Sequence, residues 1–244
     1  MRFTPEILSF IRGEQFSNAL KIHYSERFPE QSRIELLLQL SRGKRVLHIG
    51  CADHLPLINQ KMEQGKWLHA LLRNVADECT GIDINAEAVE FMSDTLKIPD
   101  IYHVDITNGL PEKLRERKWD VVIMGEILEH IDNPVHFLQQ LKTHLQQQAS
   151  QLVITVPNSF NRLIMNDISI NTEDINSDHM YHFTPYTLAR VLYKSGFATF
   201  ELLFADRVAL PFLQKISNRL KKIFGLKKSF TSNYFASLIA VTNF

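Results

Sequence analysis

The sequence lacks the features that mark secreted, membrane-spanning or nucleic-acid-coating proteins. It has only two cysteines, Cys51 and Cys79, so no disulfide framework is implied and we expect a reducing compartment. Its 27 basic and 27 acidic side chains give a formal net charge of zero, which argues against a protein whose main function is to bind nucleic-acid phosphates. Residues 1–6 lack the apolar run of a signal peptide, and the most apolar run, 235–241, is too short to cross a bilayer. We therefore expect a soluble cytoplasmic protein.

Glycine is also scarce, and one of the nine glycines marks the most informative stretch, Val46–His54. Val46 to Ile49 are typical of a short buried strand, and Gly50 follows at once. Glycine tolerates positive φ and, without a Cβ, lets a ligand approach the backbone. A strand, a tight turn and a helix indicate a nucleotide-type pocket at the carboxyl end of a parallel strand. The fuller glycine fingerprint of a dinucleotide-binding dehydrogenase is absent.

Strand and helix patterns alternate along the chain. We predict strands at 46–49, 79–83, 101–104, 119–124 and 151–156, two closing strands at 198–204 and 234–242, and helices at 57–76, 86–96, 134–145 and 185–195. This alternation predicts an α/β fold with a parallel sheet and right-handed crossovers. Ligands of such sheets lie beyond the carboxyl ends of the strands. Gly50, Asp83, Asp105, Glu126 and Asn158 should therefore rim one crevice.

Three segments lie outside this alternation. Residues 1–43 show helical spacing and no strand pattern, which predicts a helical N-terminal extension. Residues 161–178 are polar and irregular, and we expect a loop over the crevice. The stretch 207–244 contains seven basic residues and no acid, and 207–230 combines them with an apolar helical stripe. A basic insertion of this kind is most often a solvated helix; the alternative is peripheral contact of 207–228 with an anionic membrane.

Taken together, these residues resemble the class I S-adenosylmethionine-dependent methyltransferases, over about residues 44–205 and the last strand. Val46–Ala52 is similar to the family's glycine-rich first motif. Trp119–Pro134 resembles the fourth motif of the subgroup that contains ubiquinone-pathway O-methyltransferases. The resemblance implies a Rossmann-like, seven-stranded sheet, mostly parallel with the last strand antiparallel, with helices on both faces. It makes residues 44–244 one methyltransferase domain.

The resemblance also implies S-adenosyl-L-methionine as the cofactor. Asp83 matches the acid that holds the ribose hydroxyls in the family, and Asp105 matches the acid that faces the adenine. A carboxylate suits a vicinal diol because it offers two acceptor oxygens. Taken singly, each acid is better explained as a helix cap or a turn residue. The predicted cofactor-binding residues are His48, Gly50, Ala52, Asp83, Ile84, Asp105, Ile106 and Gly125.

The chain departs from the family pattern in two motifs. His48 stands where the first motif usually has an acid, and Ala52 and His54 replace its second and third glycines. Residues 147–150 replace the common Pro-Gly-Gly before the fifth strand. These departures leave open a non-catalytic binding protein on a methyltransferase scaffold.

The group Glu126-x-x-Glu129-His130 is the most specific candidate for a catalytic or metal-binding site. If a helical turn starts near Gly125, the three side chains share one face, at the mouth of the crevice. With His179 downstream they form a predicted site for a divalent cation such as Mg²⁺. This spacing resembles the metal site of the small-RNA 3′-terminal 2′-O-methyltransferases. The alternatives are a metal-free general base at His130 or His179, and a purely structural role as helix-start acids.

We predict that His130, Glu129 and His179 carry the catalysis of an O-methyltransferase. Its acceptor is expected to be a hydroxyl on a small molecule, a glycan or a lipid-linked compound. An RNA 2′-O-methyltransferase is the alternative enzyme, although zero net charge argues against a nucleic-acid partner. An oxygen acceptor requires that its proton be removed, for which a general base contributes about 100- to 10,000-fold.

Overall fold

A seven-stranded sheet forms the centre of the molecule in the computed structural model, which describes residues 1, 3–24, 31–208 and 235–244. The strands are β1 (Arg45–Ile49), β2 (Glu78–Asp83), β3 (Ile101–His103), β4 (Trp119–Gly125), β5 (Ala149–Pro157), β6 (Phe200–Arg207) and β7 (Phe235–Asn243). The α-helices are α1 (Pro5–Arg12), α2 (Arg33–Ser41), α3 (Leu55–Glu63), α4 (Leu68–Val75), α5 (Ala86–Glu90), α6 (Glu112–Arg115), α7 (Pro134–Leu145), α8 (Arg162–Ser169) and α9 (Pro185–Lys194). Three short helices complete the described set: a π-helix η1 (Phe91–Thr95) and 3₁₀ helices η2 (Ile106–Asn108) and η3 (Leu128–His130).

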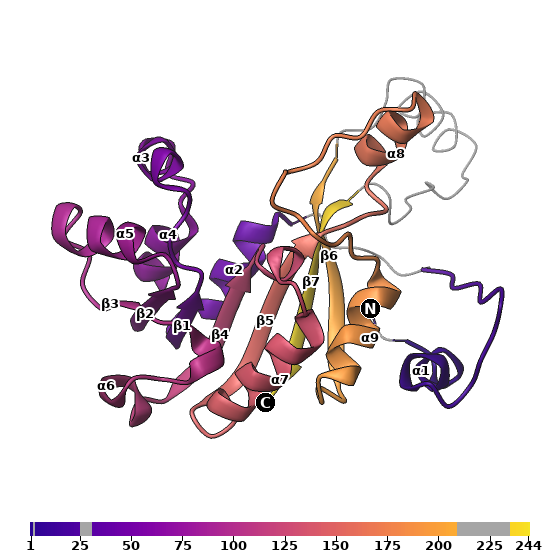
Figure 1. The fold of residues 1–244 in the computed structure, drawn as a ribbon, viewed down its shortest axis with the longest axis horizontal. Coiled ribbons are helices and arrows are strands. Elements are labelled where there is room, and N and C mark those ends of the chain that lie inside the picture. The colour runs from indigo at the N-terminus through magenta and orange to yellow at the C-terminus, as the bar shows by residue number, and fades with distance from the viewer. Residues whose placement is uncertain (2, 25–30, 209–234) are drawn as a thin grey trace, which may run out of the picture.

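The strand order is β3-β2-β1-β4-β5-β7-β6 (Figure 1). The pairs β3–β2, β2–β1, β1–β4 and β4–β5 are parallel, whereas β7 is antiparallel to both β5 and β6. The predicted sheet, with its last strand antiparallel, is confirmed. The strand order reverses between β1 and β4, and ligands of such sheets bind beyond the carboxyl ends of the strands at this point.

Helices cover both faces because successive strand residues point to opposite sides. Leu47, Val122 and Leu152 face a core shared with α1, α6, α7 and α9. Val46 and Val121 face the other side, where Leu37 of α2 and Leu72 of α4 pack. Figure 1 shows α7 and α9 together on one side of the sheet.

Several predicted helix boundaries are confirmed by their caps. Asn85, Asn133 and Thr184 each accept a hydrogen bond from a backbone N–H in the first turn of α5, α7 and α9. Helix α7 has the predicted bounds. Within residues 1–43, α1 packs against α9 and α2 against α4.

Two predicted elements are wrong. The single helix at 57–76 is two helices, α3 and α4, because Gly65 has φ of +62° and ends the first. The irregular loop at 161–178 contains α8, capped by Asn161. The basic insertion at 207–230 lies outside the described residues except for 207 and 208. No helix in the described parts of the chain has the length and apolarity needed to span a membrane.

Candidate functional site

The turn after β1 is held tightly against β2. Gly50 has φ of +67°, and the backbone N–H groups of Gly50 and Cys51 donate to the Ile82 carbonyl at 2.9 and 3.2 Å. A Cβ on Gly50 would lie 2.3 Å from Cδ1 of Ile127, in the loop after β4. Glycine is thus required here for its φ and for the close approach of Ile127.

Asp83 ties this turn to the end of β2. Its Oδ2 accepts from Ala52 N at 2.9 Å and its Oδ1 from Asn85 N at 2.9 Å. Burial raises the pKa of Asp83, while the bonds from Asn85 and Ala52 oppose the rise. Each carboxylate oxygen retains a lone pair for a further donor. The neighbouring Ile84 side chain is 71% exposed, an unusual position for a large apolar group.

Asp105 follows β3 at the same edge of the sheet. Its carboxylate caps η2 by accepting from Thr107 N at 2.9 Å, Thr107 Oγ1 at 2.7 Å and Asn108 Nδ2 at 2.8 Å. The exposed Asp105 is thus engaged as a turn acid, the alternative raised by its sequence context. Ile106 is buried in the core of the sheet.

His48 lies under this turn and points to α4. Its Nδ1 is 3.1 Å from Nδ1 of His69, and the two rings stack with an interplanar angle of 10°. Burial lowers the pKa of both imidazoles, to about 3 for His69. The imidazole of His69 fits against β2 because residue 81 is a glycine: a Cβ there would lie 2.9 Å from Cε1 of His69. A neutral histidine pair therefore occupies the position where an acid is usual.

Glu126 does not share a helical turn with Glu129 and His130, so that prediction is wrong. Glu126 has φ of +56°, and the helical turn η3 begins only at Leu128. Glu126 Oε1 accepts from Thr155 Oγ1 at 2.9 Å and lies 3.9 Å from Arg33 Nε. Burial raises the pKa of Glu126 despite the Arg33 charge. Gly125 lies beside the same arginine, whose Nη1 would be 3.4 Å from an added Cβ.

Glu129, His130 and His179 do come together. One potential ligand atom from each lies within 4.8 Å of the others. The rings of His130 and His179 meet edge to face, with centroids 4.6 Å apart, and His130 Nδ1 lies 3.1 Å from the Asp178 carbonyl oxygen. The Glu129 carbonyl accepts from Met180 N and Tyr181 N at 2.8 and 3.2 Å. These bonds fix the segment after α8 against η3.

The Glu129 carboxyl group is the most unusual feature of the cluster. It is fully buried, and neither oxygen has a hydrogen-bond partner in the described structure. Its nearest ionisable contact is Nε2 of His179, 4.0 Å from Oε1. Burial, with a smaller contribution from the Glu126 charge, raises the pKa of Glu129 to about 8. A buried carboxylate without a partner is costly, and such groups occur where a proton or a cation is bound.

Sequence reasoning missed Arg33, Thr155 and His69. Arg33 belongs to the predicted N-terminal extension, yet its Nε lies within 4.0 Å of both Glu126 and Asp206. No pattern in the sequence links a residue at position 33 to the exit of β4. No pattern in the sequence links His69 on α4 to His48 either, and its Nε2 has no hydrogen-bond partner in the described structure.

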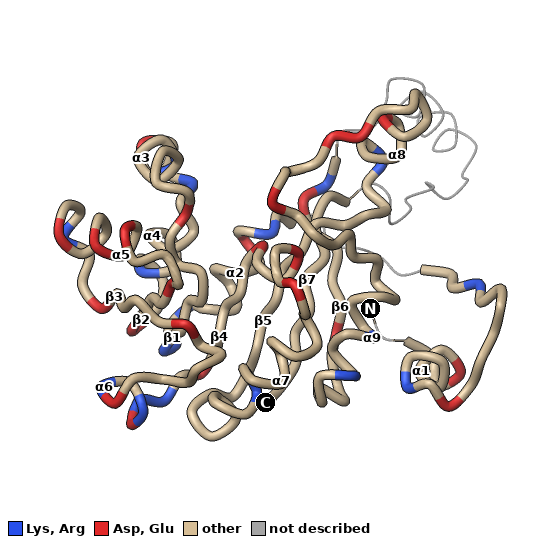
Figure 2. The backbone as a smooth tube through the Cα atoms, viewed as in Figure 1, with Lys and Arg blue, Asp and Glu red and all other residues tan. Residues whose placement is uncertain are grey.

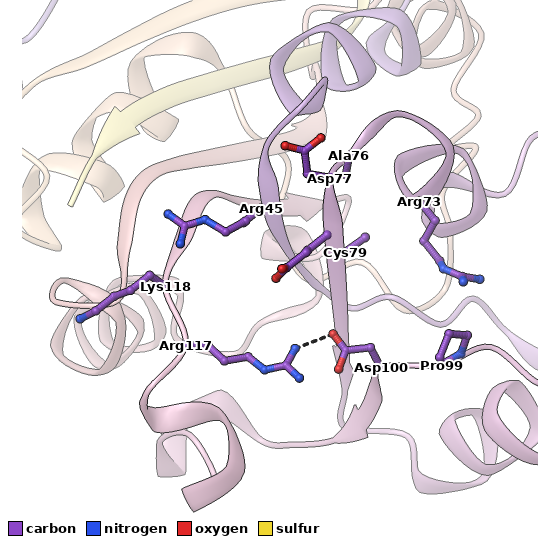
Figure 3. A pocket seen from close by; sticks show the side chains of 10 residues that line it. Arg45, Arg73, Ala76, Asp77, Cys79, Pro99, Asp100, Arg117 and Lys118 are labelled. Carbon is purple, nitrogen blue, oxygen red and sulfur yellow. Dashed lines mark hydrogen bonds and ion pairs between the residues drawn. The ribbon is translucent and has the colours of Figure 1, made fainter.

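A cavity of about 620 Å³ lies at the opposite, amino-terminal edge of the sheet (Figure 3). Arg45, Arg73, Arg117 and Lys118 line it together with Asp77, Glu78 and Asp100. Arg117 donates to Asp100 at 2.6 Å, and Arg45 pairs with Asp120 at 2.9 Å. Two of these four cations are thus paired with acids, and the strand ends that position Gly50, Asp83 and Glu129 lie at the far edge. We therefore place the candidate site at the carboxyl edge.

Comparison with known proteins identifies the family of the chain. The model of a family described as "Methyltransferase domain" matches residues 22–202. No curated protein matches the chain. A search of solved structures finds a SAM-dependent methyltransferase from Archaeoglobus fulgidus, with 18% identity, a TM-score of 0.50 and coverage of 86% of this chain and 94% of that one.

Two further solved structures are similar in fold. A SAM-dependent methyltransferase from Thermotoga maritima has 12% identity, a TM-score of 0.54 and coverage of 87% of both chains. The small RNA methyltransferase HEN1 has 17% identity and a TM-score of 0.55, and the match covers 94% of this chain but 27% of that one. At these identities the structural matches establish the fold alone.

Proposed function

This chain belongs to the class I S-adenosylmethionine-dependent methyltransferases, and we propose that it methylates a hydroxyl oxygen of a small, sugar or lipid-linked acceptor. The observation that carries the proposal is the buried, unpartnered carboxyl group of Glu129 beside His130 and His179. It lies at the exit of β4, next to the strand-order reversal where ligands of such sheets bind.

The residues at the ends of β1 and β2 suit S-adenosylmethionine. The two oxygens of Asp83 can each accept one more hydrogen bond from a ribose hydroxyl. The exposed Ile84 offers an apolar surface to a purine ring. We propose that Gly50, Ala52, Asp83, Ile84 and Asp105 hold the cofactor, with His48 supporting the turn from beneath.

Bound S-adenosylmethionine supplies a methyl group on a positively charged sulfur. The acceptor oxygen forms a bond to that carbon, the carbon–sulfur bond breaks with its electron pair left on sulfur, and the acceptor loses its proton. The protein's tasks are to align the acceptor with the methyl group and to take the proton. We assign the second task to His130 and His179, with Glu129, in the ionised form that it takes above its raised pKa, stabilising the charge that the imidazole gains.

A divalent cation is the alternative way to activate the hydroxyl. Glu129, His130 and His179 would hold it, and it would lower the pKa of the acceptor oxygen. Two imidazoles and one carboxylate form a plausible set for a first-row transition metal or for Mg²⁺ with water ligands. Glu126 does not belong to this set because it is engaged by Thr155 and Arg33.

An RNA 2′-hydroxyl is the second candidate acceptor. The acid–histidine cluster supports it, and the fold is similar to that of a protein named as a small RNA methyltransferase. The balanced charge of the chain counts against it, because an RNA site normally carries a basic surface.

Methyl transfer from radiolabelled S-adenosylmethionine to a panel of glycans, lipid-linked sugars and RNA 3′ ends tests these alternatives, with and without chelator. Glu129→Gln should lower turnover by about 100-fold or more while leaving cofactor affinity unchanged. His136→Asn is a matched control, because His136 is an exposed histidine on α7. Turnover that is insensitive to Glu129→Gln and His179→Asn would refute the assigned roles.

A further inference from the structure

Helix α8 has an apolar surface that the rest of the described structure leaves uncovered. Four of its eight residues are Leu, Ile or Met, yet none is buried. A helix this apolar normally packs its apolar side against a core. Including the chain that follows, residues 163–180 carry six exposed apolar side chains, between 41% and 69% exposed: Leu163, Met165, Ile168, Ile170, Ile175 and Met180.

This surface, which we call the α8 surface, is continuous with the catalytic cluster. Met180 N donates to the Glu129 carbonyl at 2.8 Å, and the preceding residue is His179. The Asp178 carbonyl lies 3.1 Å from His130 Nδ1. The chain that carries these apolar residues therefore ends beside the proposed proton acceptors, and it begins at α8, which stands beyond the ends of β5 and β7 (Figure 1).

The charge of the segment limits what can cover it. From the start of α8 the segment 162–180 contains one basic residue, Arg162, and four acids: Asp167, Glu173, Asp174 and Asp178. Figure 2 shows acidic positions along the tube that leaves α8. An RNA backbone or an anionic membrane would be repelled by this surface. An uncharged hydrocarbon chain would be attracted to its side chains.

We infer that the α8 surface binds the hydrocarbon part of an amphiphilic acceptor, whose hydroxylated head then reaches Glu129, His130 and His179. This inference rests on the proposed methyl transfer, because that reaction supplies the acceptor. The acceptor class is thus a neutral hydroxylated head group on an alkyl or isoprenoid chain. Burial of that chain adds affinity with each methylene in contact.

The test is a chain-length series of neutral ligands. Methyl, hexyl and octyl β-D-glucoside are titrated by calorimetry into the full-length protein below their micelle concentrations, with and without S-adenosylhomocysteine. The expected result is an octyl glucoside Kd at least about tenfold tighter than that of methyl glucoside, since full burial gives about fourfold per methylene. The double variant Ile168→Asn/Ile170→Asn should remove most of this dependence.

Phe16→Asn is the matched control, because Phe16 is 84% exposed outside the α8 surface and its removal should leave the dependence intact. Equal affinity across the series, or an unchanged dependence in the double variant, would overturn the inference. So would self-association of the protein that Ile168→Asn/Ile170→Asn abolishes without any alkyl-chain effect. S-adenosylhomocysteine binding is measured separately. If it does not bind, the proposed function is refuted. If it binds but the Kd does not change with the length of the alkyl chain, only this inference is refuted.

Discussion

Nδ1 of His48 and Nδ1 of His69 face each other at 3.1 Å beneath the turn that follows β1. One Nδ1 must donate and the other accept, and burial favours the neutral form of both rings. Burial lowers the pKa of each, and a proton on either would face its partner without a counter-charge. The pair therefore supports the first turn only while it stays unprotonated.

This pair predicts a loss of stability in mild acid. The pKa of His69 falls from its ordinary 6.5 to about 3 on folding, so the unfolded chain takes up protons first. The stabilisation is fully present above pH 6.5 and is lost as the pH falls toward 3. Each histidine should lower the free energy of unfolding by about 1 kcal/mol per pH unit below 6. Urea unfolding at several pH values should show a shallower slope for His48→Asn/His69→Asn; an identical slope would contradict this assignment.

For Glu129 we predict the opposite pH dependence of stability. Its pKa of about 8 in the folded protein means that, between about 4.5 and 8, the folded state holds a proton that the unfolded state lacks. Stability therefore falls as the pH rises through that window. Glu129→Gln should raise the free energy of unfolding at pH 8 by roughly 4 kcal/mol and leave it little changed at pH 4.5.

The measurement is urea unfolding with chelator present, and Glu87→Gln on an exposed position of α5 is the control. A Glu129→Gln protein that is less stable than the wild type at pH 8 would contradict the account of an unpartnered carboxyl group.

Substitutions of Glu126 can test whether the backbone after β4 has the left-handed conformation. Its φ of +56° is costly for any residue with a Cβ. Glu126→Gly and Glu126→Ala lose the same contacts with Thr155 and Arg33, and differ only in the Cβ and its conformational effects. We expect the glycine variant to be more stable than the alanine variant by about 1 kcal/mol, measured by chemical denaturation. The reverse order would show that position 126 is not held in the left-handed region.

Gly50 and Gly65 form a natural comparison for the first turn. Both have positive φ, +67° and +62°, but a Cβ on Gly65 meets nothing within 4 Å, whereas one on Gly50 meets Ile127. Gly50→Ala should therefore cost about 1 kcal/mol more than Gly65→Ala. In a double-mutant cycle, Ile127→Ala should recover that excess. Equal costs for the two glycines would exclude the contact with Ile127 as the reason for Gly50.

The fold was predictable because its signals are local and repeated. The predicted helix starts at Pro134 and Pro185 are those of α7 and α9. The break at Gly65 was missed because the apolar spacing over 57–76 fits one continuous helix. Helix α8 was missed although four of its eight residues are Leu, Ile or Met, because it is short and lies within the otherwise polar stretch 161–178.

The site was predictable only in part, because side-chain direction depends on φ and on distant partners. The spacing of Glu126, Glu129 and His130 suggested one helical face, but the left-handed φ of Glu126 turns that residue to Arg33. Glu129, His130 and His179 were predicted together, and the structure brings them within ligand distance. The pairing of His48 with His69 depends on the register of β1 beside Gly81, which one sequence does not encode locally.

The central claim is that S-adenosylmethionine binds at the ends of β1 and β2. Calorimetric titration of S-adenosylhomocysteine into the wild-type protein and into Asp83→Ala tests it most directly. We predict saturable binding with one site per chain, weakened by about tenfold or more in Asp83→Ala, since a hydrogen-bonded charged partner contributes about 1.5 to 3 kcal/mol. A folded wild-type protein that gives no heat of binding, or equal affinity in the two proteins, would contradict the claim.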